Sequence, residues 1–534
     1  MWQDTYRARD VLARPQELQR VLRHPCGGVV DKEDQESSQQ WKLKNQITVR
    51  LAQKHRGTYT VKRSLLILVC AVALVAAACG AKSSSNNSAS ENEGGSTKTT
   101  AAAGTDAAMW GDLKSPCGKG SASVAPGEGP STDTLFLGVA NDRNSEIRPG
   151  LNKEFWDAAV AYTDWCNAQG GIQGVPLSPV DIDGGVVNVE AGMTKACNAV
   201  FALVGGGFAL DNLEFSGKDG SDFHKCGLID IPGFTVSVEK SLSNGQVQPL
   251  PNPANAKSSQ WITDFKKLYP EDSKKIVVVY SKDLPSLEAV KVQFDSVVAA
   301  EGGIQNLPPV AYPIVVTDWG PYAEKIIASG ATSMYWIGEP ANAANLLKVL
   351  QEKGWKGTFL NEANLYDNLF TETGGAASEG AIVRTATHPF EEAAKWPGVQ
   401  QYLDNLKKYV PDGKAAFLGL QGTSSWLLFS VAANTCAQKN KGVIDRQCVL
   451  TEANAIDNWT AGGMHAPSDP GTKVPVSCGM LLVVKNGKFE RLYPKLGGEG
   501  DDGDGFHCPA DSIVTVPPAS IVGTGNVDPS RPPL

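Results

Sequence analysis

The residues best suited to bind a ligand follow short apolar segments that we predict to be β-strands. Five such stretches are rich in glycine, hydroxyl groups or carboxylates: 205–212, 232–235, 281–286, 338–342 and 361–367. Glycine lets a backbone approach a ligand closely, and free N–H groups at the start of a following helix can hold an anion. Thr235 offers a hydroxyl, and Glu362 offers a carboxylate to a cation. These residue types predict a site for a small molecule.

Each of these features also has a structural interpretation that needs no ligand. The glycines at 205–207 are typical of a tight turn, and they lack the GxGxxG spacing of a dinucleotide site. Most loop glutamates are solvated, which is the alternative for Glu362. Trp319 and Trp336 fit a core as well as a binding site, because aromatic side chains near strand ends are usually buried.

The sequence contains no recognisable catalytic or metal-binding motif. It has no GxSxG, no HExxH, no P-loop lysine and no CxxC pair, and most of its histidines stand singly. The acidic stretch 499–506 lacks the spacing and closing glutamate of an EF-hand, so a solvated loop is the better interpretation. We therefore predict no catalytic residue, no cofactor and no metal.

The elements that must position these loops alternate between strands and helices. Apolar runs at 135–140, 177–182, 201–204 and 227–231 alternate with segments of helical periodicity, and a second such series follows from residue 258. The run 275–280 is almost entirely apolar, as expected for a parallel strand covered on both faces. Asn486–Gly487 between apolar runs predicts a hairpin. The pattern predicts an α/β fold with two doubly wound parallel-sheet lobes.

Charge and composition exclude some partners. The chain has 534 residues, 42% of them hydrophobic, and a net charge of −8. This balance argues against nucleic acid, which usually requires a basic face. It also provides no polybasic segment for anionic lipid, so any attachment to a membrane must come from another feature.

Residues 61–79 have the features of a secretory signal that ends in a lipid-modified cysteine. Lys62 and Arg63 precede an apolar run, and small residues lead to Cys79. The apolar run is shorter than the ~20 residues that span a bilayer, which disfavours the alternative of a retained helix. The arrangement resembles the lipobox of bacterial lipoproteins, which implies lipidation of Cys79. Because a signal belongs at the start of a chain, we expect residues 1–60 to be a start-site artefact, or else a disordered extension.

Eight cysteines beyond Cys79 form an even count in a chain predicted to be exported, which indicates disulfides. The count does not define the pairing. Proximity favours Cys436–Cys448, and Cys478–Cys508 would join the hairpin to the tail. Cys197–Cys226 and Cys117–Cys166 are then the pairs that remain.

The order of the motifs resembles the type I periplasmic-binding fold, specifically branched-chain amino-acid (Leu/Ile/Val-type) substrate-binding proteins of ABC transporters. The resemblance covers about residues 133–494. Its most specific part is NAQGGIQGVPL at 167–177, and it also rests on LFLGVA, LVGGGFALD, CGLIDIPGFT, KKIVVVYS, SMYWIGEPANAANLL and GTFLNEAN.

The resemblance implies two lobes joined by a three-strand hinge. Lobe one would comprise 133–253 and 381–474, and lobe two 254–380 and 475–494. A flexible tether, 80–132, would precede them and a loose tail, 495–534, would follow.

The resemblance also implies a set of ligand-binding residues. The two first-lobe loops that hold the ligand carboxylate in amino-acid binders correspond to Gly207, Phe208, Ala209, Gly233, Phe234 and Thr235. Glu362 corresponds to the glutamate that receives the ligand ammonium, and the aromatic loop position falls near Trp336 and Glu339. The chain departs from the family pattern at Phe208–Ala209, where serine is frequent, and at Phe234. An amide, a peptide or a larger apolar solute is therefore an alternative to an amino acid.

We expect an extracytoplasmic lipoprotein that captures a small ligand and delivers it to an ABC permease. The expected partners are that ligand, the permease and, through the lipid on Cys79, the outer face of the cell membrane. Two alternatives are a sensor for a signalling partner and an exported enzyme on the same scaffold, because a fold alone does not define a function.

Overall fold

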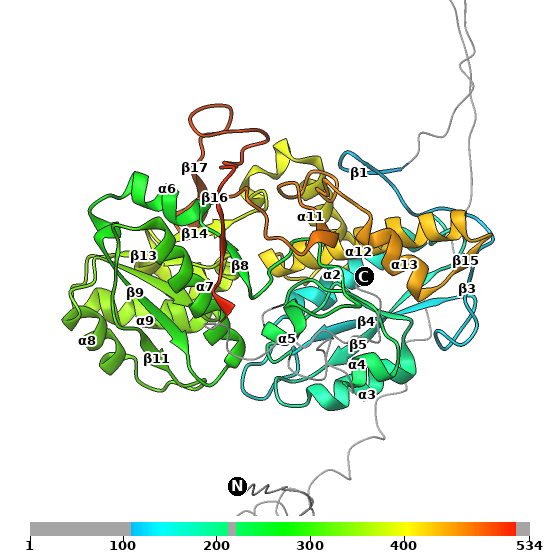
Figure 1. Ribbon diagram of the computed structural model, residues 1–534, viewed down its shortest axis with the longest axis horizontal. Coiled ribbons are helices and arrows are strands. Elements are labelled where there is room, and N and C mark those ends of the chain that lie inside the picture. Colours follow the sequence, from blue (N-terminus) through cyan, green and yellow to red (C-terminus); the bar gives the residue numbers. More distant parts are fainter. Residues whose placement is uncertain (1–107, 212–220, 236, 519–534) are drawn as a thin grey trace, which may run out of the picture. The chain divides into compact units, whose positions relative to one another are not determined.

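The computed structural model describes residues 108–211, 221–235 and 237–518 (Figure 1). The predicted signal segment 61–79, the lipidation of Cys79 and the interpretation of residues 1–60 lie outside these residues. None of the described helices is long and apolar enough to cross a membrane.

The first lobe contains a sheet of four parallel strands in the order β5–β4–β6–β7. The strands are β4 (Leu135–Asn141), β5 (Leu177–Asp183), β6 (Ala202–Val204) and β7 (Asp230–Ile231). Leu135, Leu137 and Val139 pack in one core with helices α2 (Lys153–Asn167) and α12 (Phe417–Lys439), whereas Ala140 packs on the opposite face with α3 (Val189–Ala199). The sheet is therefore covered on both faces, as its apolar strands require.

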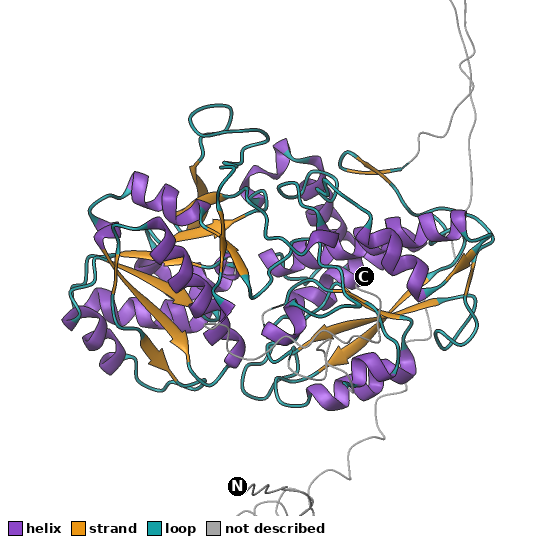
Figure 2. Ribbon diagram, viewed as in Figure 1, coloured by secondary structure: helices purple, strands orange, loops and turns teal. Residues whose placement is uncertain are grey.

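The second lobe contains an eight-stranded sheet in the order β10–β9–β12–β13–β14–β16–β17, with β11 also beside β9. Its strands are β9 (Lys275–Ser281), β10 (Gln305–Asn306), β11 (Val310–Tyr312), β12 (Ser333–Ile337), β13 (Thr358–Asn361), β14 (Ile382–Thr385), β16 (Met480–Lys485) and β17 (Lys488–Tyr493). Helices pack on both faces (Figure 2): α8 (Gly320–Ala328) and α9 (Pro340–Glu352) on one, α6 (Gln260–Leu268) and α7 (Pro285–Glu301) on the other.

This sheet differs from the prediction in two respects. The predicted hairpin is present as β16 and β17, but β16 is antiparallel to β14, so the sheet is mixed rather than parallel. The predicted boundary at residue 381 is also too early, because β14 pairs with β13 and β16 inside the second lobe. An isolated apolar strand such as β14 carries no sequence signal for the lobe to which it belongs.

Shorter elements complete the described chain. The remaining helices are α4 (Asp222–Lys225), α5 (Val238–Ser241), α10 (Asn368–Gly374), α11 (Pro397–Tyr409) and α13 (Arg446–Asn454). The remaining strands are β1 (Met109–Trp110), β2 (Leu113–Lys114), β3 (Ser123–Val124), β8 (Ala256–Ser258), β15 (Val443–Ile444) and β18 (Ile513–Thr515).

Three chain segments cross between the lobes beside one another. Thr387 and His465 form an antiparallel bridge, flanked by backbone hydrogen bonds from His388 to Met464 and from Ala466 to Ala386. The hydroxyl of Ser468 donates to the Pro249 carbonyl at 2.6 Å, which connects this pair to the third crossing segment. The predicted three-strand hinge is confirmed.

The predicted tether and tail are wrong for the residues that the structure describes. Trp110 is 1% exposed and packs edge-on against Trp165, and β3 pairs with β15. At the other end, β18 pairs with β8, and Val516 is buried. Residues 108–132 and 495–518 therefore belong to the folded body, because their few apolar side chains find partners that composition alone does not reveal.

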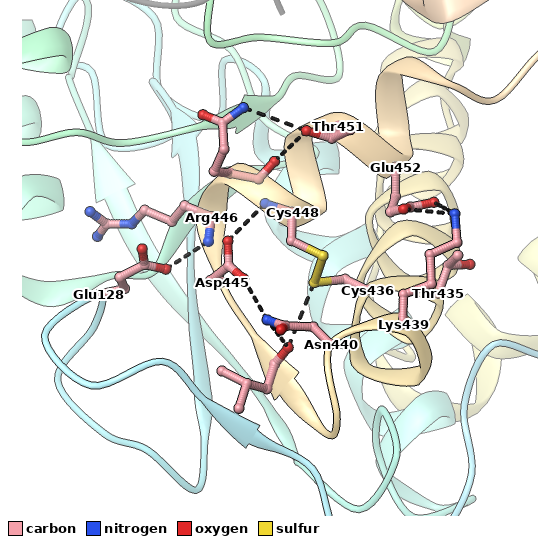
Figure 3. The surroundings of a disulfide bond; sticks show 12 residues. Glu128, Thr435, Cys436, Lys439, Asn440, Asp445, Arg446, Cys448, Thr451 and Glu452 are labelled. Atoms are coloured by element: carbon pink, nitrogen blue, oxygen red, sulfur yellow. Dashed lines mark hydrogen bonds and ion pairs between the residues drawn. A yellow bond between two sulfur atoms is a disulfide. The ribbon is translucent and has the colours of Figure 1, made fainter.

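Four disulfides join the cysteines that follow Cys79 in sequence: Cys117–Cys166, Cys197–Cys226, Cys436–Cys448 and Cys478–Cys508. Figure 3 shows the third, where Asp445 accepts a hydrogen bond from the Cys448 amide at 2.8 Å and caps α13. Cys436, Asp445 and Cys448 are the one group of described side chains spaced to share a metal ion, but their two sulfurs are bonded to each other.

Candidate ligand-binding cleft

A cavity of about 290 Å³ lies between the two lobes, at the carboxyl ends of their parallel strands. The first lobe contributes the loops after β4, β5, β6 and β7, and the second contributes the loops after β9, β12, β13 and β14. Ligands of open α/β sheets bind at this edge. The exposed wall is mainly apolar, with aliphatic side chains such as Leu151, Leu284, Ile337 and Leu418.

Five of the nine predicted ligand-binding residues line this cavity. They are Ala209, Phe234 and Thr235 from the first lobe, and Glu339 and Glu362 from the second. The structure therefore brings the two predicted first-lobe loops opposite the two predicted second-lobe carboxylates.

The other four predicted residues do not line the cavity. Phe208 is 1% exposed in the core between β5 and α3, where its ring lies next to Gly192. A Cβ on Gly207 would lie 2.4 Å from the Phe234 ring, and one on Gly233 would lie 2.7 Å from Phe155. These glycines make room for the stacked Phe155–Phe234 pair.

Trp336 is the fourth of these residues, and its side chain is fully buried. Its ring stacks on Tyr312 at 4.9 Å, in the core on the α8–α9 face of the second sheet. Alternation along β12 explains this position, because Trp336 and Tyr335 point to opposite faces of the sheet. The core interpretation of Trp336 therefore holds.

The Thr235 hydroxyl donates its proton within the protein. It bonds to Gln248 Oε1 at 2.9 Å, and the same oxygen accepts the Asn252 amide at 3.1 Å. The Thr235 side chain therefore fixes the hinge-proximal segment that follows β7. Towards a ligand this hydroxyl has only acceptor capacity left.

Asp142 holds two first-lobe loops in place at the cavity. Its two carboxylate oxygens accept the backbone amides of Val186 and Ala209, both at 2.7 Å. Val186 has a φ of 74°, which is unfavourable for a β-branched residue. The bond to Asp142 helps to keep this strained residue in the cavity wall. Burial raises the pKa of Asp142, although both amide bonds oppose that rise.

Glu362 lies in a buried cluster with Lys257, Arg384 and Tyr335. Its Oε1 accepts the Tyr335 hydroxyl at 2.6 Å and lies 3.1 Å from Lys257 Nζ, and its Oε2 accepts Arg384 Nη2. Lys257 comes from β8 in a crossing segment, and Arg384 from the end of β14. Both oxygens of the predicted ammonium-binding carboxylate are therefore engaged by side chains of the protein.

Burial and charge oppose each other in this cluster. Burial alone would raise the pKa of Glu362, but the charges of Arg384 and Lys257 outweigh it and hold the pKa at about 2. Burial, assisted by repulsion from Arg384, lowers the pKa of Lys257 to about 8 despite the opposing effect of Glu362. At neutral pH the cluster therefore carries one negative and two positive charges.

Two contacts close the cavity by connecting the lobes. Arg148, in the loop after β4, forms an ion pair with Glu339, and the Ser286 hydroxyl of α7 donates to the Ala209 carbonyl at 3.2 Å. Glu339 is also the N-cap of α9 and accepts the amides of Ala341 at 3.0 Å and Asn342 at 2.9 Å. The predicted Glu339 thus positions α9 and reaches the other lobe.

Sequence reasoning missed three charged residues of the cavity: Arg148, Lys257 and Arg384. Arg384 had a usable signal, because an arginine within an otherwise apolar strand (IVRT) must find a partner when the strand is buried. Arg148 lies in the loop after β4, and ligands of open α/β sheets bind beside such loops at the carboxyl ends of the strands, so the same rule could have identified it. Lys257 has no such signal, because the proline- and asparagine-rich sequence before it does not indicate the strand β8 that carries it.

Two α/β lobes that enclose a cavity at their strand ends, joined by three crossing segments, define a two-lobed binding protein. The periplasmic binding protein family model matches residues 134–488, and the chain therefore belongs to this family. Its role is that of a solute-binding protein.

Three solved structures show how similar the fold is to known proteins. A leucine binding protein from Thermotoga maritima MSB8 is 15% identical, with 67% of this chain and 98% of that chain covered and a TM-score of 0.53. A fatty acid ABC transporter substrate-binding protein from Thermomonospora curvata is 17% identical, with 69% and 94% covered and a TM-score of 0.56.

The third, an ABC transporter substrate binding protein from Aeropyrum pernix, is 15% identical, with 71% of this chain and 97% of that chain covered and a TM-score of 0.56. No curated protein matches the sequence. These likenesses show the fold, and they confirm the predicted two-lobed class.

Proposed function

We propose that the protein captures a small solute in the cavity between its lobes and delivers it to an ABC permease. The observation that carries this proposal is a mainly apolar cavity of about 290 Å³, enclosed by strand-end loops of both lobes. The size and the wall are typical of small-molecule sites. Two related structures are named as ABC transporter substrate-binding proteins, which supports delivery to a permease.

Binding would proceed by closure of the hinge. The three crossing segments permit rotation of the lobes, and a ligand that contacts both lobes favours the closed state by its differential affinity for that state. The Arg148–Glu339 ion pair connects the lobes across the cavity and is a contact that opening must break. This role is one of binding rather than catalysis, so we expect the ligand to be recovered unchanged.

The ligand that we propose is a small organic molecule with an apolar body. Two of the similar structures are a leucine binding protein and a fatty acid ABC transporter substrate-binding protein, and leucine and fatty acids both have such a body. The amino acid, amide or similar ligand that the sequence predicts also falls within this description.

We propose that the mature protein is anchored to the outer face of the cell membrane by lipid on Cys79. Growth with radiolabelled fatty acid should label the wild-type protein and leave Cys79→Ala unlabelled. Equal labelling of both proteins would exclude Cys79 as the site of acylation.

The test of solute capture is a thermal-shift screen of the purified protein against amino acids, amides, carboxylates, amines, short peptides and sugars. A ligand at 100 times its dissociation constant stabilises the protein by about 2.7 kcal/mol. Small-angle scattering should show closure with the hit. Arg148→Gln should make the ligand-free protein more extended, whereas Lys439→Ala, which removes an ion pair between α12 and α13, should not. No shift from any class of solute would contradict the proposal.

A further inference from the structure

The charged side chains of the cavity do not balance. Among the described residues that line it, three are cationic and two are anionic: Arg148, Lys257, Arg384, Glu339 and Glu362. Arg148 and Glu339 neutralise each other in the ion pair between the lobes. The surplus positive charge therefore lies in the second-lobe cluster, where Lys257 and Arg384 share the single carboxylate of Glu362.

The cluster has unused hydrogen-bond donors but no unused carboxylate oxygen. Within the described part of the chain, Glu362 is the acceptor that Lys257 Nζ contacts, although an ammonium has three donors. Arg384 Nε is buried and has no hydrogen-bond partner among the described residues. Both Glu362 oxygens already accept protons from these side chains and from Tyr335. Buried donors without acceptors are costly, so the cluster is suited to an added anion.

The same arrangement is unfavourable for a ligand ammonium. An incoming cation would find Glu362 already neutralised and would meet a net positive charge at short range. Repulsion between like charges is strong where water is excluded, and the Lys257 side chain is only 5% exposed. The lowered pKa of Lys257, caused by burial and then by Arg384, is consistent with a cluster that lacks negative charge.

The rest of the cavity supplies an apolar surface. Leu284, Ile337 and Leu418 line its wall, and Phe234 is also part of it. A ligand that meets both the cluster and this wall must combine a negative head with an apolar body.

We infer that the cavity selects organic monoanions, such as carboxylates with an aliphatic or aromatic body and no ammonium group, through Lys257 and Arg384. This inference rests on the proposed function, because it assigns the charge class of the solute that the cavity captures. It also reverses the role that the sequence predicts for Glu362, which holds the two cations in place instead of receiving the ligand.

The test compares ligands that differ only in the head group. Calorimetric titrations of the purified protein use straight-chain carboxylates from butanoate to dodecanoate and phenylacetate, together with the matching primary amides and amines, and leucine. The best carboxylate should bind at least tenfold more tightly than its amide, because a hydrogen bond to a charged group is stronger than one between neutral groups. The matching amine should bind more weakly still.

Variants then test whether the cluster is responsible. Arg384→Gln keeps the Lys257–Glu362 pair and should weaken carboxylate binding roughly 10- to 100-fold while leaving amide binding within a few-fold. Arg384→Lys, which retains the charge, should restore part of the affinity. Arg143→Gln is the matched control, because it removes an arginine paired with Asp181 outside the cavity lining.

The outcomes separate this inference from the proposed function. Tight binding of leucine or an amine, with weak binding of every carboxylate, would keep the solute receptor and overturn the monoanion inference. Carboxylate binding that is unchanged in Arg384→Gln would also overturn it. Binding of no compound in any class would contradict the proposed function and this inference together.

Discussion

Replacement of Glu362 by glutamine should destabilise the protein strongly, although it removes one charge and almost no volume. In the native protein this carboxylate is 13% exposed and lies between Lys257 and Arg384. The glutamine variant would leave two buried cations without a counter-charge. Removal of one partner from a buried ion pair costs about 3–5 kcal/mol.

The expected shift in melting temperature follows from the size of the folded body. The described body spans residues 108–518, so at ~2.1 cal/mol/K per residue its unfolding entropy is close to 0.9 kcal/mol/K. A loss of about 3–5 kcal/mol therefore corresponds to a decrease of about 4–6 °C. Differential scanning calorimetry of wild type and Glu362→Gln measures it directly.

The pH dependence of this loss identifies its cause. Lys257 has a folded pKa of about 8, below its unfolded value, and removal of Glu362 should lower that pKa further. Between the lowered pKa of Lys257 in the variant and pH 8, Lys257 is mostly neutral in the folded variant but still protonated in the unfolded variant. The unfolded variant therefore binds more protons, and the variant gains stability as the pH rises. The wild type gains little from Lys257 in this range, because its Lys257 loses its proton only as the pH approaches 8. The deficit of the variant should therefore be larger at pH 6 than at pH 8.

A double variant is the control for this reasoning. In Glu362→Gln/Lys257→Met the buried amine is absent, and the deficit should no longer change between pH 6 and pH 8. A Glu362→Gln protein that melts within about 1 °C of the wild type at pH 6 would refute the view that Glu362 neutralises the buried cations.

Two further predictions concern stability away from the cavity. Burial lowers the pKa of His465 to about 4, so the unfolded protein takes up a proton at this residue before the folded protein does, and about 2 kcal/mol of stability should be lost between pH 7 and pH 5. Urea unfolding at both pH values should show a smaller loss of stability for His465→Gln than for the wild type. An identical loss in the two proteins would contradict this assignment. Arg446 donates to the carbonyls of Phe201, Cys226, Gly227 and Val200, so Arg446→Lys should lose about 2–3 kcal/mol in urea unfolding, whereas Lys439→Ala should lose less than about 1 kcal/mol.

The sequence predicts the two lobes well because their signals are local. An apolar strand such as β9 must be covered on both faces, and it can be recognised from its own residues. The hairpin of β16 and β17 is specified by Asn486–Gly487, and the closest cysteine pair, Cys436–Cys448, forms as proximity suggests. Each of these features depends on residues that are near one another in sequence.

The cavity is predicted less well because its chemistry depends on residues far apart in sequence. The strand-end rule finds Ala209, Phe234 and Glu339, but it does not show that the Phe208 ring turns into the core. The local direction of the backbone determines whether the Phe208 ring points into the core or into the cavity, and the residue type alone does not indicate that direction. The prediction of a flexible tether is wrong at residues 108–132 for the same reason, since Trp110 is buried against Trp165 and Tyr162, which are about fifty residues away in the sequence.

Glu362 shows why a matching residue is weaker evidence for a ligand than its surroundings are. The loop after β13 places the carboxylate at the cavity, as the family pattern implies, but β8 and β14 add Lys257 and Arg384 beside it. One cation neutralises the charge of a carboxylate, whereas two cations leave the group with a net positive charge that attracts an anion. Two positions, more than a hundred residues apart in the chain, thus determine the sign of the charge that the cavity presents. The monoanionic ligand that we propose therefore depends on Lys257 and Arg384, and not on the position of Glu362 alone.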